Sequence, residues 1–190
     1  MPAEIRARSK HTKTATPQTL VSFVEYKNIR FLILDCPTNS NLPAYFREFC
    51  YHHVTDVVRV CEPTYSAEPL VAAGMNVHDW PYPDGSVPPP DIIQQWLKLV
   101  KNSSTRNQQG ETSTIAIHCV AGLGRAPVLV AIALIDKGMD SLNAIEFVRS
   151  KRKGAFNNRQ IKYLDSYRRQ KVPVSFKKSL RKIFKFSQSV

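Results

Sequence analysis

The residues best suited to covalent chemistry lie together in one short segment, HCVAGLGRAP at 118–127. Cys119 and Arg125 stand six residues apart, with Gly122 and Gly124 between them. A thiolate is a strong nucleophile, and a guanidinium presents a planar fork that matches two oxygens of a phosphate group. The glycines permit tight backbone turns that direct several N–H groups toward one anion. The segment therefore predicts a nucleophile, Cys119, in a phosphate-binding loop that contains Arg125.

The elements on either side of this loop support the prediction. Residues 114–119 (TIAIHC) have the pattern of a buried strand, and residues 126–137 that of a helix closed by Gly138. The positive end of a helix attracts anions, so it also favours the thiolate form of Cys119. A purely structural cysteine needs no glycine-rich turn and helix start after it. His118 is expected to orient the loop, whose other members are Val120, Ala121, Gly122, Leu123, Gly124 and Ala126.

Strand and helix patterns alternate along the chain and predict an α/β fold with a central, mostly parallel sheet flanked by helices on both faces. Strands are expected at 28–35, 54–61 and within 73–80, helices at 42–53, 91–101, 140–151 and 157–169, and a polar surface loop at 102–113. We expect one catalytic domain at 21–170. A flexible basic leader (1–20) precedes it and a basic tail (171–190) follows it.

A thiolate nucleophile needs a general acid to protonate the leaving oxygen. Asp84 is the candidate, because the prolines and glycine around it in WPYPDG (80–85) suit a mobile lid. Asp79 is the rival carboxylate. It precedes the rigid Trp80-Pro81 pair, which favours a role in hydrogen-bonding the base of the loop.

The rest of the composition indicates which cofactors and which cellular location to expect. The four cysteines and five histidines show no metal-ligand spacing, so neither a metal nor another cofactor is predicted. No segment has the apolar length of a transmembrane helix or of a secretion signal, and a cytoplasmic location is expected.

Several separated motifs resemble the PRL (phosphatase of regenerating liver) family, a branch of the dual-specificity protein tyrosine phosphatases. They are YKNIRFLI, PTN at 37–39, VVRVCEPTY at 57–65, DWPYPDG at 79–85, HCVAGLGRAPVLVAIALIDKGM and KRKGAFN at 151–157. The resemblance spans about residues 26–169 and implies a phosphoprotein substrate. It also places the general acid at Asp84. Pro83 departs from the family pattern, in which a second acid usually stands.

Two further residues gain an interpretation from this resemblance. In the family the residue matching Cys61 forms a reversible disulfide with the one matching Cys119; from the sequence alone, a small buried hydrophobe is an open alternative for Cys61. Ala126 stands where most phosphatases of this mechanism have Ser or Thr, whose hydroxyl stabilises the departing thiolate. Slow turnover is therefore predicted. Arg59 and Glu62 next to Cys61 are expected either to hold the pocket rim together or to form an ordinary surface ion pair.

The net charge of +12 is concentrated at the ends of the chain. Residues 168–190 hold eight basic side chains and no acid, and SFKKSLRKIFKFSQSV (175–190) has the spacing of a basic amphipathic helix. Residues 174–190 are thus predicted to bind an anionic membrane surface, with packing on the domain or disorder as the alternatives. The family's C-terminal prenylation box has no counterpart, because no cysteine follows Cys119. No base-reading element indicates specific nucleic-acid binding.

These observations leave two classes of function. The first is an enzyme that hydrolyses phosphomonoesters through a phosphocysteine intermediate. The second is a binding module that uses the same pocket, since members of the PRL family bind CNNM-type magnesium transporters.

Overall fold

Five strands form one sheet in residues 21–169, the part of the chain that the computed structural model describes. Their order is β1-β2-β5-β3-β4, and their bounds are Val21–Tyr26 (β1), Ile29–Leu34 (β2), Val54–Arg59 (β3), Asn76–Asp79 (β4) and Thr114–His118 (β5). Strands β2, β5, β3 and β4 run parallel, and β1 pairs antiparallel with β2 at the edge. The prediction of a mostly parallel α/β sheet is confirmed.

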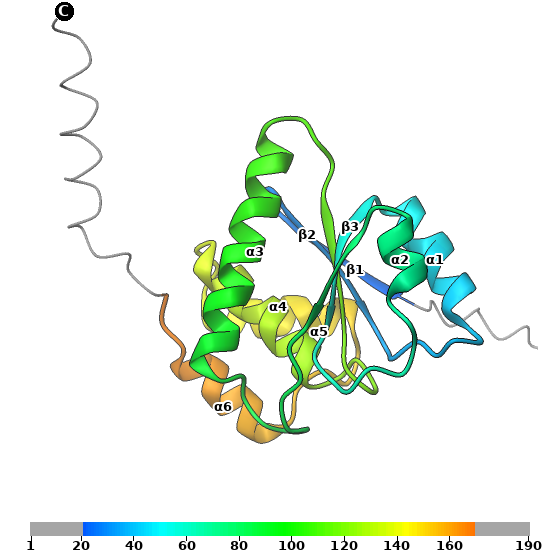
Figure 1. Ribbon diagram of the computed structural model, residues 1–190. Coiled ribbons are helices and arrows are strands. Elements are labelled where there is room, and N and C mark those ends of the chain that lie inside the picture. Colours follow the sequence, from blue (N-terminus) through cyan, green and yellow to red (C-terminus); the bar gives the residue numbers. More distant parts are fainter. Residues whose placement is uncertain (1–20, 170–190) are drawn as a thin grey trace, which may run out of the picture.

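Helices cover both faces of this sheet (Figure 1). The smaller layer packs α1 (Leu42–Tyr51) and α2 (Glu68–Ala72) against one face through a core that includes Tyr45, Phe49 and Leu70. The larger layer covers the other face with α3 (Pro90–Gln108), α4 (Arg125–Asp136), α5 (Ser141–Lys151) and α6 (Asn158–Ser166). The central strand β5 is buried at every position, as expected for a parallel strand covered on both sides.

The predicted surface loop at 102–113 is wrong for most of its length, because α3 continues to Gln108. Ser103 and Ser104 are buried in this part of the helix despite their polarity. The Ser103 hydroxyl lies 2.9 Å from Ser113 Oγ, and the Asn107 side chain accepts from the Ser113 N–H and donates to its carbonyl. Specific hydrogen bonds thus replace the apolar contacts that a hydrophobic pattern would have revealed.

Two elements have no counterpart in the sequence prediction, the edge strand β1 and the short helix α2. The other predicted strands and helices are confirmed, with boundaries that differ by a few residues. Asp140 caps α5, since its carboxylate accepts from the backbone N–H groups of Leu142 and Asn143.

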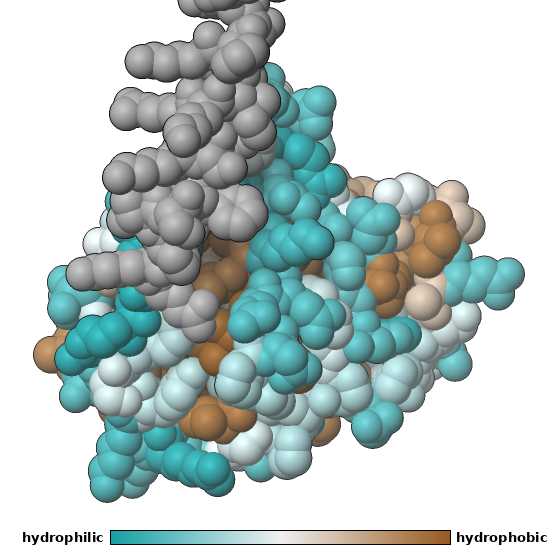
Figure 2. All heavy atoms as spheres, turned by 60° about the vertical axis from the view of Figure 1, so that its left-hand side comes forward, coloured by the Kyte–Doolittle hydropathy of each residue, from teal (hydrophilic) through white to brown (hydrophobic). Residues whose placement is uncertain are grey.

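The helices in the described part of the chain do not include one that is both long and apolar enough to cross a bilayer. Helix α3 directs Ile92, Ile93, Trp96 and Val100 inward, and most of its other side chains are polar. Figure 2 accordingly shows a mostly hydrophilic face with smaller hydrophobic areas between the polar side chains.

Candidate active site

The loop after the central strand forms the floor of the site. Cys119 directly follows β5, and α4 begins at Arg125, so the loop joins a buried strand to a helix N-terminus as predicted. Cys119 is 2% exposed. Gly122 has a φ of +65°, and a Cβ at this position would overlap the Leu34 carbonyl. The loop therefore requires glycine at 122 for both conformation and space.

The carbonyl groups of loop residues 120–124 all accept hydrogen bonds from the surrounding protein. Val120 O accepts from the Cys36 N–H at 2.9 Å, Leu123 O from the Phe156 N–H at 2.8 Å, and Gly124 O from the Val128 N–H at 3.1 Å. The Arg152 guanidinium donates to Ala121 O and Gly122 O at 3.2 and 3.3 Å. Because the carbonyls are turned toward these donors, the amide groups on the opposite side of the loop are left for an anion above Cys119.

Arg152 is a residue that the sequence analysis missed. It directly follows α5 and belongs to the KRKGAFN segment at 151–157, which in the sequence indicates only the family resemblance. One basic residue in a basic run gives no signal of its own. Only the packing of this turn beside the loop identifies Arg152 as the one that braces it.

The lid and the loop are joined by Arg125. Its Nη1 donates to Tyr82 O at 2.9 Å, and the Tyr82 hydroxyl donates back to Arg125 O at 2.9 Å. Asp84, two residues further along the lid, brings Oδ1 to 3.1 Å from Arg125 Nε. The Nε–H does not point at this oxygen in hydrogen-bond geometry, so the contact is an ion pair. The Asp84 side chain is 78% exposed, in contrast to the buried arginine.

A pocket of about 300 Å³ lies between the lid and the loop. Asp84 and Cys119 both line it, and Phe156, Asn157 and Gln160 close it from the start of α6. Gln160 is completely buried, and its amide donates to Ser86 O at 3.0 Å, which connects α6 to the end of the lid. Gln160 could not be singled out from the sequence, because a glutamine in an amphipathic helix resembles any other polar residue.

His118 lies beneath the loop, fully buried at the end of β5. The Tyr65 hydroxyl is 2.9 Å from its Nε2. Burial lowers the pKa of His118 to about 4, so the ring is neutral at physiological pH. The tyrosine fixes the ring under the nucleophile, which fits the predicted orienting role.

Cys61 follows β3, the strand next to β5, two residues after its last residue. Val60 N–H donates to His118 O at 3.0 Å, which continues the pairing of β3 with β5. The Sγ atom of Cys61 lies 3.7 Å from the Sγ atom of Cys36. Burial and then the neighbouring Cys36 raise the pKa of Cys61 to about 12. Cys36, which the sequence analysis gave no role, is thus part of the site's surroundings.

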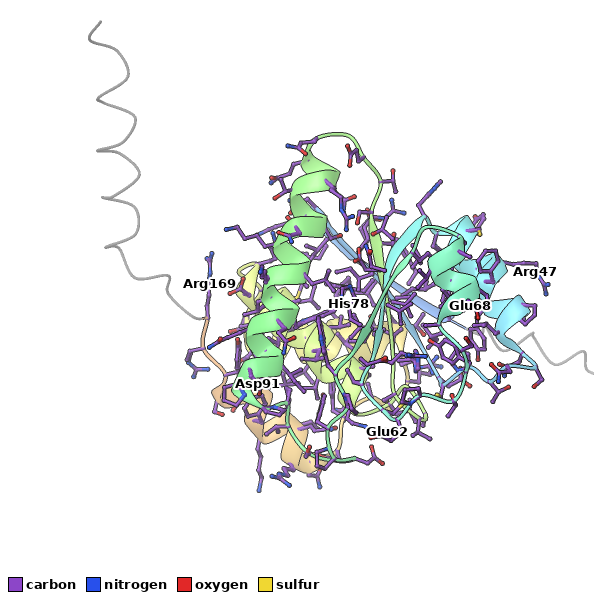
Figure 3. The ribbon with its side chains drawn as sticks, viewed as in Figure 1. Arg47, Glu62, Glu68, His78, Asp91 and Arg169 are labelled. Atoms are coloured by element: carbon purple, nitrogen blue, oxygen red, sulfur yellow. The ribbon has the colours of Figure 1, made fainter. Side chains whose placement is uncertain are left out.

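Arg59 pairs with Asp79 and not with Glu62, the partner expected from the sequence. Arg59 is buried, and its Nη2 lies 2.7 Å from Asp79 Oδ2, while Nη1 donates to Tyr65 O. This pairing with Arg59 lowers the pKa of Asp79. Glu62 is instead exposed, and Figure 3 places it near the carboxyl ends of the parallel strands. Asp79 therefore anchors β4 to β3, and neither predicted role for an Arg59–Glu62 pair is found.

The fold and the pocket together define a cysteine-based protein phosphatase. Residues 39–168 match the family model of the protein-tyrosine phosphatases. A probable protein tyrosine phosphatase type IVA from Dictyostelium discoideum is 49% identical over 150 residues, which cover 79% of this chain and 89% of that protein. The human protein tyrosine phosphatase type IVA 3 is 49% identical over 145 residues, covering 76% and 82% of the two chains.

Among solved structures, a Leishmania major protein tyrosine phosphatase aligns with a TM-score of 0.72 and 40% identity. The alignment covers 80% of this chain and all of the other. The chain therefore belongs to the type IVA (PRL) family of protein tyrosine phosphatases. Its activity is that of a cysteine-based protein-tyrosine phosphatase acting on phosphoproteins.

Proposed function

We propose that Cys119 attacks the phosphorus of a phosphomonoester while Arg125 and the loop amides hold the phosphoryl oxygens. Asp84 protonates the leaving oxygen, and water then hydrolyses the phosphocysteine. The observation that carries this assignment is the shared pocket. Cys119 and Asp84 both line it, and Asp84 Oδ1 lies 3.1 Å from Arg125 Nε.

A comparison of three proteins tests the assignment. Wild type, Cys119→Ser and Asp84→Ala are assayed on a phosphotyrosine peptide, and the acid-quenched protein is analysed for phosphocysteine. We expect no phosphocysteine in Cys119→Ser and slow formation in Asp84→Ala. Unchanged phosphocysteine formation in Asp84→Ala would remove Asp84 as the acid of the first step.

The hydrolysis step is proposed to be slow. Ala126 is fully buried in the first turn of α4 and carries no hydroxyl to stabilise the departing Cys119 thiolate. A pocket that binds phosphate and releases it slowly also suits a second function, the binding of a partner protein.

We propose the cytosolic domain of a CNNM-type magnesium transporter as that partner. The supporting observation is the rim of the pocket, where Val120 is 61% and Leu123 is 38% exposed. Exposed apolar side chains beside a concave site favour contact with another protein. Leu123→Asp should weaken capture of the purified transporter domain, whereas Leu142→Asp, a similarly exposed leucine on α5, should not. Equal binding by both variants would argue against this use of the pocket.

Cys61 is proposed to form a reversible disulfide with Cys119 on oxidation, as the resemblance implies. Both side chains are buried and follow neighbouring strands. Mild peroxide should inactivate the enzyme, and a thiol reductant should restore it. Mass spectrometry that finds no 61–119 bridge at any time during oxidation would eliminate this pairing.

The enzyme is proposed to work in the cytoplasm, attached weakly to anionic membranes through residues 174–190. These residues lie outside the described part of the chain, so the proposal rests on the basic amphipathic pattern alone. Flotation with anionic liposomes should capture the full chain at low salt and release it at high salt. Equal flotation after deletion of 174–190 would contradict the proposal.

A further inference from the structure

Three cysteines follow three neighbouring strands at the carboxyl edge of the sheet. Cys36 comes two residues after β2, Cys119 directly after β5, and Cys61 two residues after β3. The sheet order places β5 between β2 and β3. The loops that carry Cys36 and Cys61 therefore arrive from opposite sides of the catalytic strand.

These two loops bring their thiols together. The Sγ atoms of Cys36 and Cys61 are 3.7 Å apart, close to the contact distance of two non-bonded sulfur atoms. A disulfide needs a sulfur separation of about 2.05 Å, so the two sulfurs are neighbours that must still approach each other to bond. Cys36 also lies directly beside the catalytic loop, because its N–H donates to Val120 O at 2.9 Å.

The surroundings of Cys36 leave its sulfur free to react. The Thr64 hydroxyl donates to Pro37 O at 2.6 Å, so the 3.0 Å contact between Cys36 Sγ and Thr64 Oγ1 is made by the thiol proton. Cys36 is half-buried, whereas Cys61 is 3% exposed. Of the two thiols that meet here, Cys36 is the more accessible to solvent.

We propose that Cys36 is a third redox cysteine of this phosphatase, which takes Cys61 into a Cys36–Cys61 disulfide and thereby releases Cys119 as an active thiolate. The proposal rests on the function assigned above to Cys119 and Cys61. It adds a further step, in which the Cys119 thiolate is restored while the disulfide moves to Cys36 and Cys61.

Hydrogen peroxide is the oxidant, and it reaches Cys119 through the pocket that this residue lines. The Cys119 thiolate attacks one peroxide oxygen, the O–O bond breaks, and the product is a sulfenic acid with hydroxide, which takes up a proton to become water. The Cys61 sulfur then displaces the sulfenic hydroxyl. The S–O bond breaks, the 61–119 disulfide forms, and the thiol proton leaves with the hydroxyl as water.

In the last step Cys36 attacks Cys61 Sγ. The 36–61 bond forms, the 61–119 bond breaks, Cys119 leaves as a thiolate, and the Cys36 proton passes to solvent. Overall, one peroxide is reduced to two waters, and the thiols of Cys36 and Cys61 are oxidised to one disulfide.

A metal site is the competing use of this cluster. The Sγ atoms of Cys36 and Cys61 and a ring nitrogen of His118 lie within 4.8 Å of one another. A structural zinc ion has four protein ligands, and these are three donors. The nearby Thr64 hydroxyl is already committed to Pro37 O. The direct contact between the sulfurs therefore favours the disulfide.

Peptide mapping distinguishes these possibilities, because the four cysteines fall on four different tryptic peptides. The full chain is treated with hydrogen peroxide, stopped with catalase at set times and alkylated before digestion. We expect the 61–119 bridge to appear first and the 36–61 bridge to replace it without added reductant. Phosphatase activity should fall and then recover over the same period.

Cys36→Ser should keep its basal activity, accumulate the 61–119 bridge and stay inactive until a thiol reductant is added. After catalase, the recovered activity of wild type should exceed that of Cys36→Ser at least about five-fold. Cys50→Ser, which removes the exposed cysteine on α1, should behave as wild type. Because basal activity is measured separately, a failure of the catalytic assignment is distinguishable from a failure of the relay.

Two results would overturn the proposal. One is an oxidised wild type that contains no 36–61 bridge at any time. The other is one equivalent of bound zinc in the protein after incubation with zinc alone, lost in Cys36→Ser, together with unchanged recovery from peroxide in that variant. Cys119→Ser provides a further check, since a 36–61 bridge that forms there as fast as in wild type contradicts the exchange route.

Discussion

Arg125 Nε lies 3.1 Å from Asp84 Oδ1, so the proposed phosphate-binding side chain and the proposed acid are paired with each other. The arginine is buried and fixed by Tyr82, whereas the aspartate is largely exposed. An incoming phosphate dianion competes with the Asp84 carboxylate for the same guanidinium. Substrate binding and placement of the acid are therefore coupled through this pair.

Replacement of Asp84 by asparagine should have opposite effects on turnover and on phosphate affinity. The loss of the acid should lower kcat by about 10²–10⁴-fold for a phosphotyrosine peptide, and less for aryl phosphates with acidic leaving groups. Removal of the carboxylate's repulsion should at the same time lower the inhibition constant of inorganic phosphate. Steady-state kinetics with phosphate as inhibitor measure both. Glu62→Gln, at an exposed carboxylate of the same sheet edge, is the control and should change neither.

Ala126→Ser should raise steady-state turnover. A hydroxyl at this buried position can hydrogen-bond the Cys119 thiolate as it leaves the phosphocysteine. We expect a gain of up to about ten-fold, below the ~10²–10³ effect of a full oxyanion-hole donor. Rapid-quench measurements should show a smaller accumulation of phosphocysteine in the variant. No gain in turnover would remove Ala126 as the cause of slow hydrolysis.

The two loop glycines should differ in their tolerance of a methyl group. Gly122 has a positive φ, and its added Cβ would overlap the Leu34 carbonyl. Gly124 has a φ of −115°, and its Cβ would meet only the Gln160 side chain, at 3.2 Å. Gly122→Ala should therefore lose most of the activity, at least about 10²-fold in kcat/KM, because the loop must change shape. Gly124→Ala should lose much less, and equal losses would contradict this geometry.

Tyr82→Phe should loosen the lid from the loop. The variant leaves the buried Arg125 carbonyl without the Tyr82 hydroxyl, at an expected cost of about 1–3 kcal/mol in the free energy of unfolding. The phosphate affinity should fall as well, since Arg125 loses part of its support. Urea denaturation and phosphate inhibition give the two values. Tyr51→Phe, at a tyrosine that is 78% exposed, should leave both at the wild-type level.

The neutral state of buried His118 should make stability depend on pH in a defined window. Its pKa is about 4 in the folded protein and 6.5 in the unfolded chain, so the unfolded chain binds more protons between these values. The contribution of His118 to the free energy of unfolding is therefore complete above pH 6.5. It is lost as the pH drops toward 4, by on the order of 3 kcal/mol. Urea denaturation at several pH values measures this slope.

The slope should be smaller in His118→Gln, which cannot titrate. The titration of Asp56 does not contribute to the slope between pH 4 and 6.5, because this carboxyl titrates at lower pH. Burial opposes its ionisation, but hydrogen bonds from His78, Thr55 and Arg106 lower the pKa of Asp56 to about 2. An unchanged slope between pH 4 and 6.5 in the variant would show that another group causes it.

The α/β class and the floor of the site follow from the sequence because they depend on local patterns. An apolar run, a glycine-rich turn and a helix start are adjacent in the chain, so a strand–loop–helix unit with Cys119 and Arg125 at the two ends of its loop could be predicted. Asp84 could be named as the candidate acid because it lies in a distinctive proline-rich segment. The continuation of α3 through residues 102–108 could not be predicted in this way. This part of the helix is held by hydrogen bonds from Ser103 and Asn107 to Ser113, beyond the end of the helix.

The sequence by itself determined the candidate nucleophile, the candidate phosphate-binding arginine and the candidate acid of this protein. Only the tertiary structure decided what surrounds them. Arg152 supports the loop, Gln160 closes the pocket, and Cys36 meets Cys61 because strand order brings separate loops to one edge of the sheet. Such contacts leave no periodic or local pattern in the chain, since each depends on residues that only the packing of distant elements brings together.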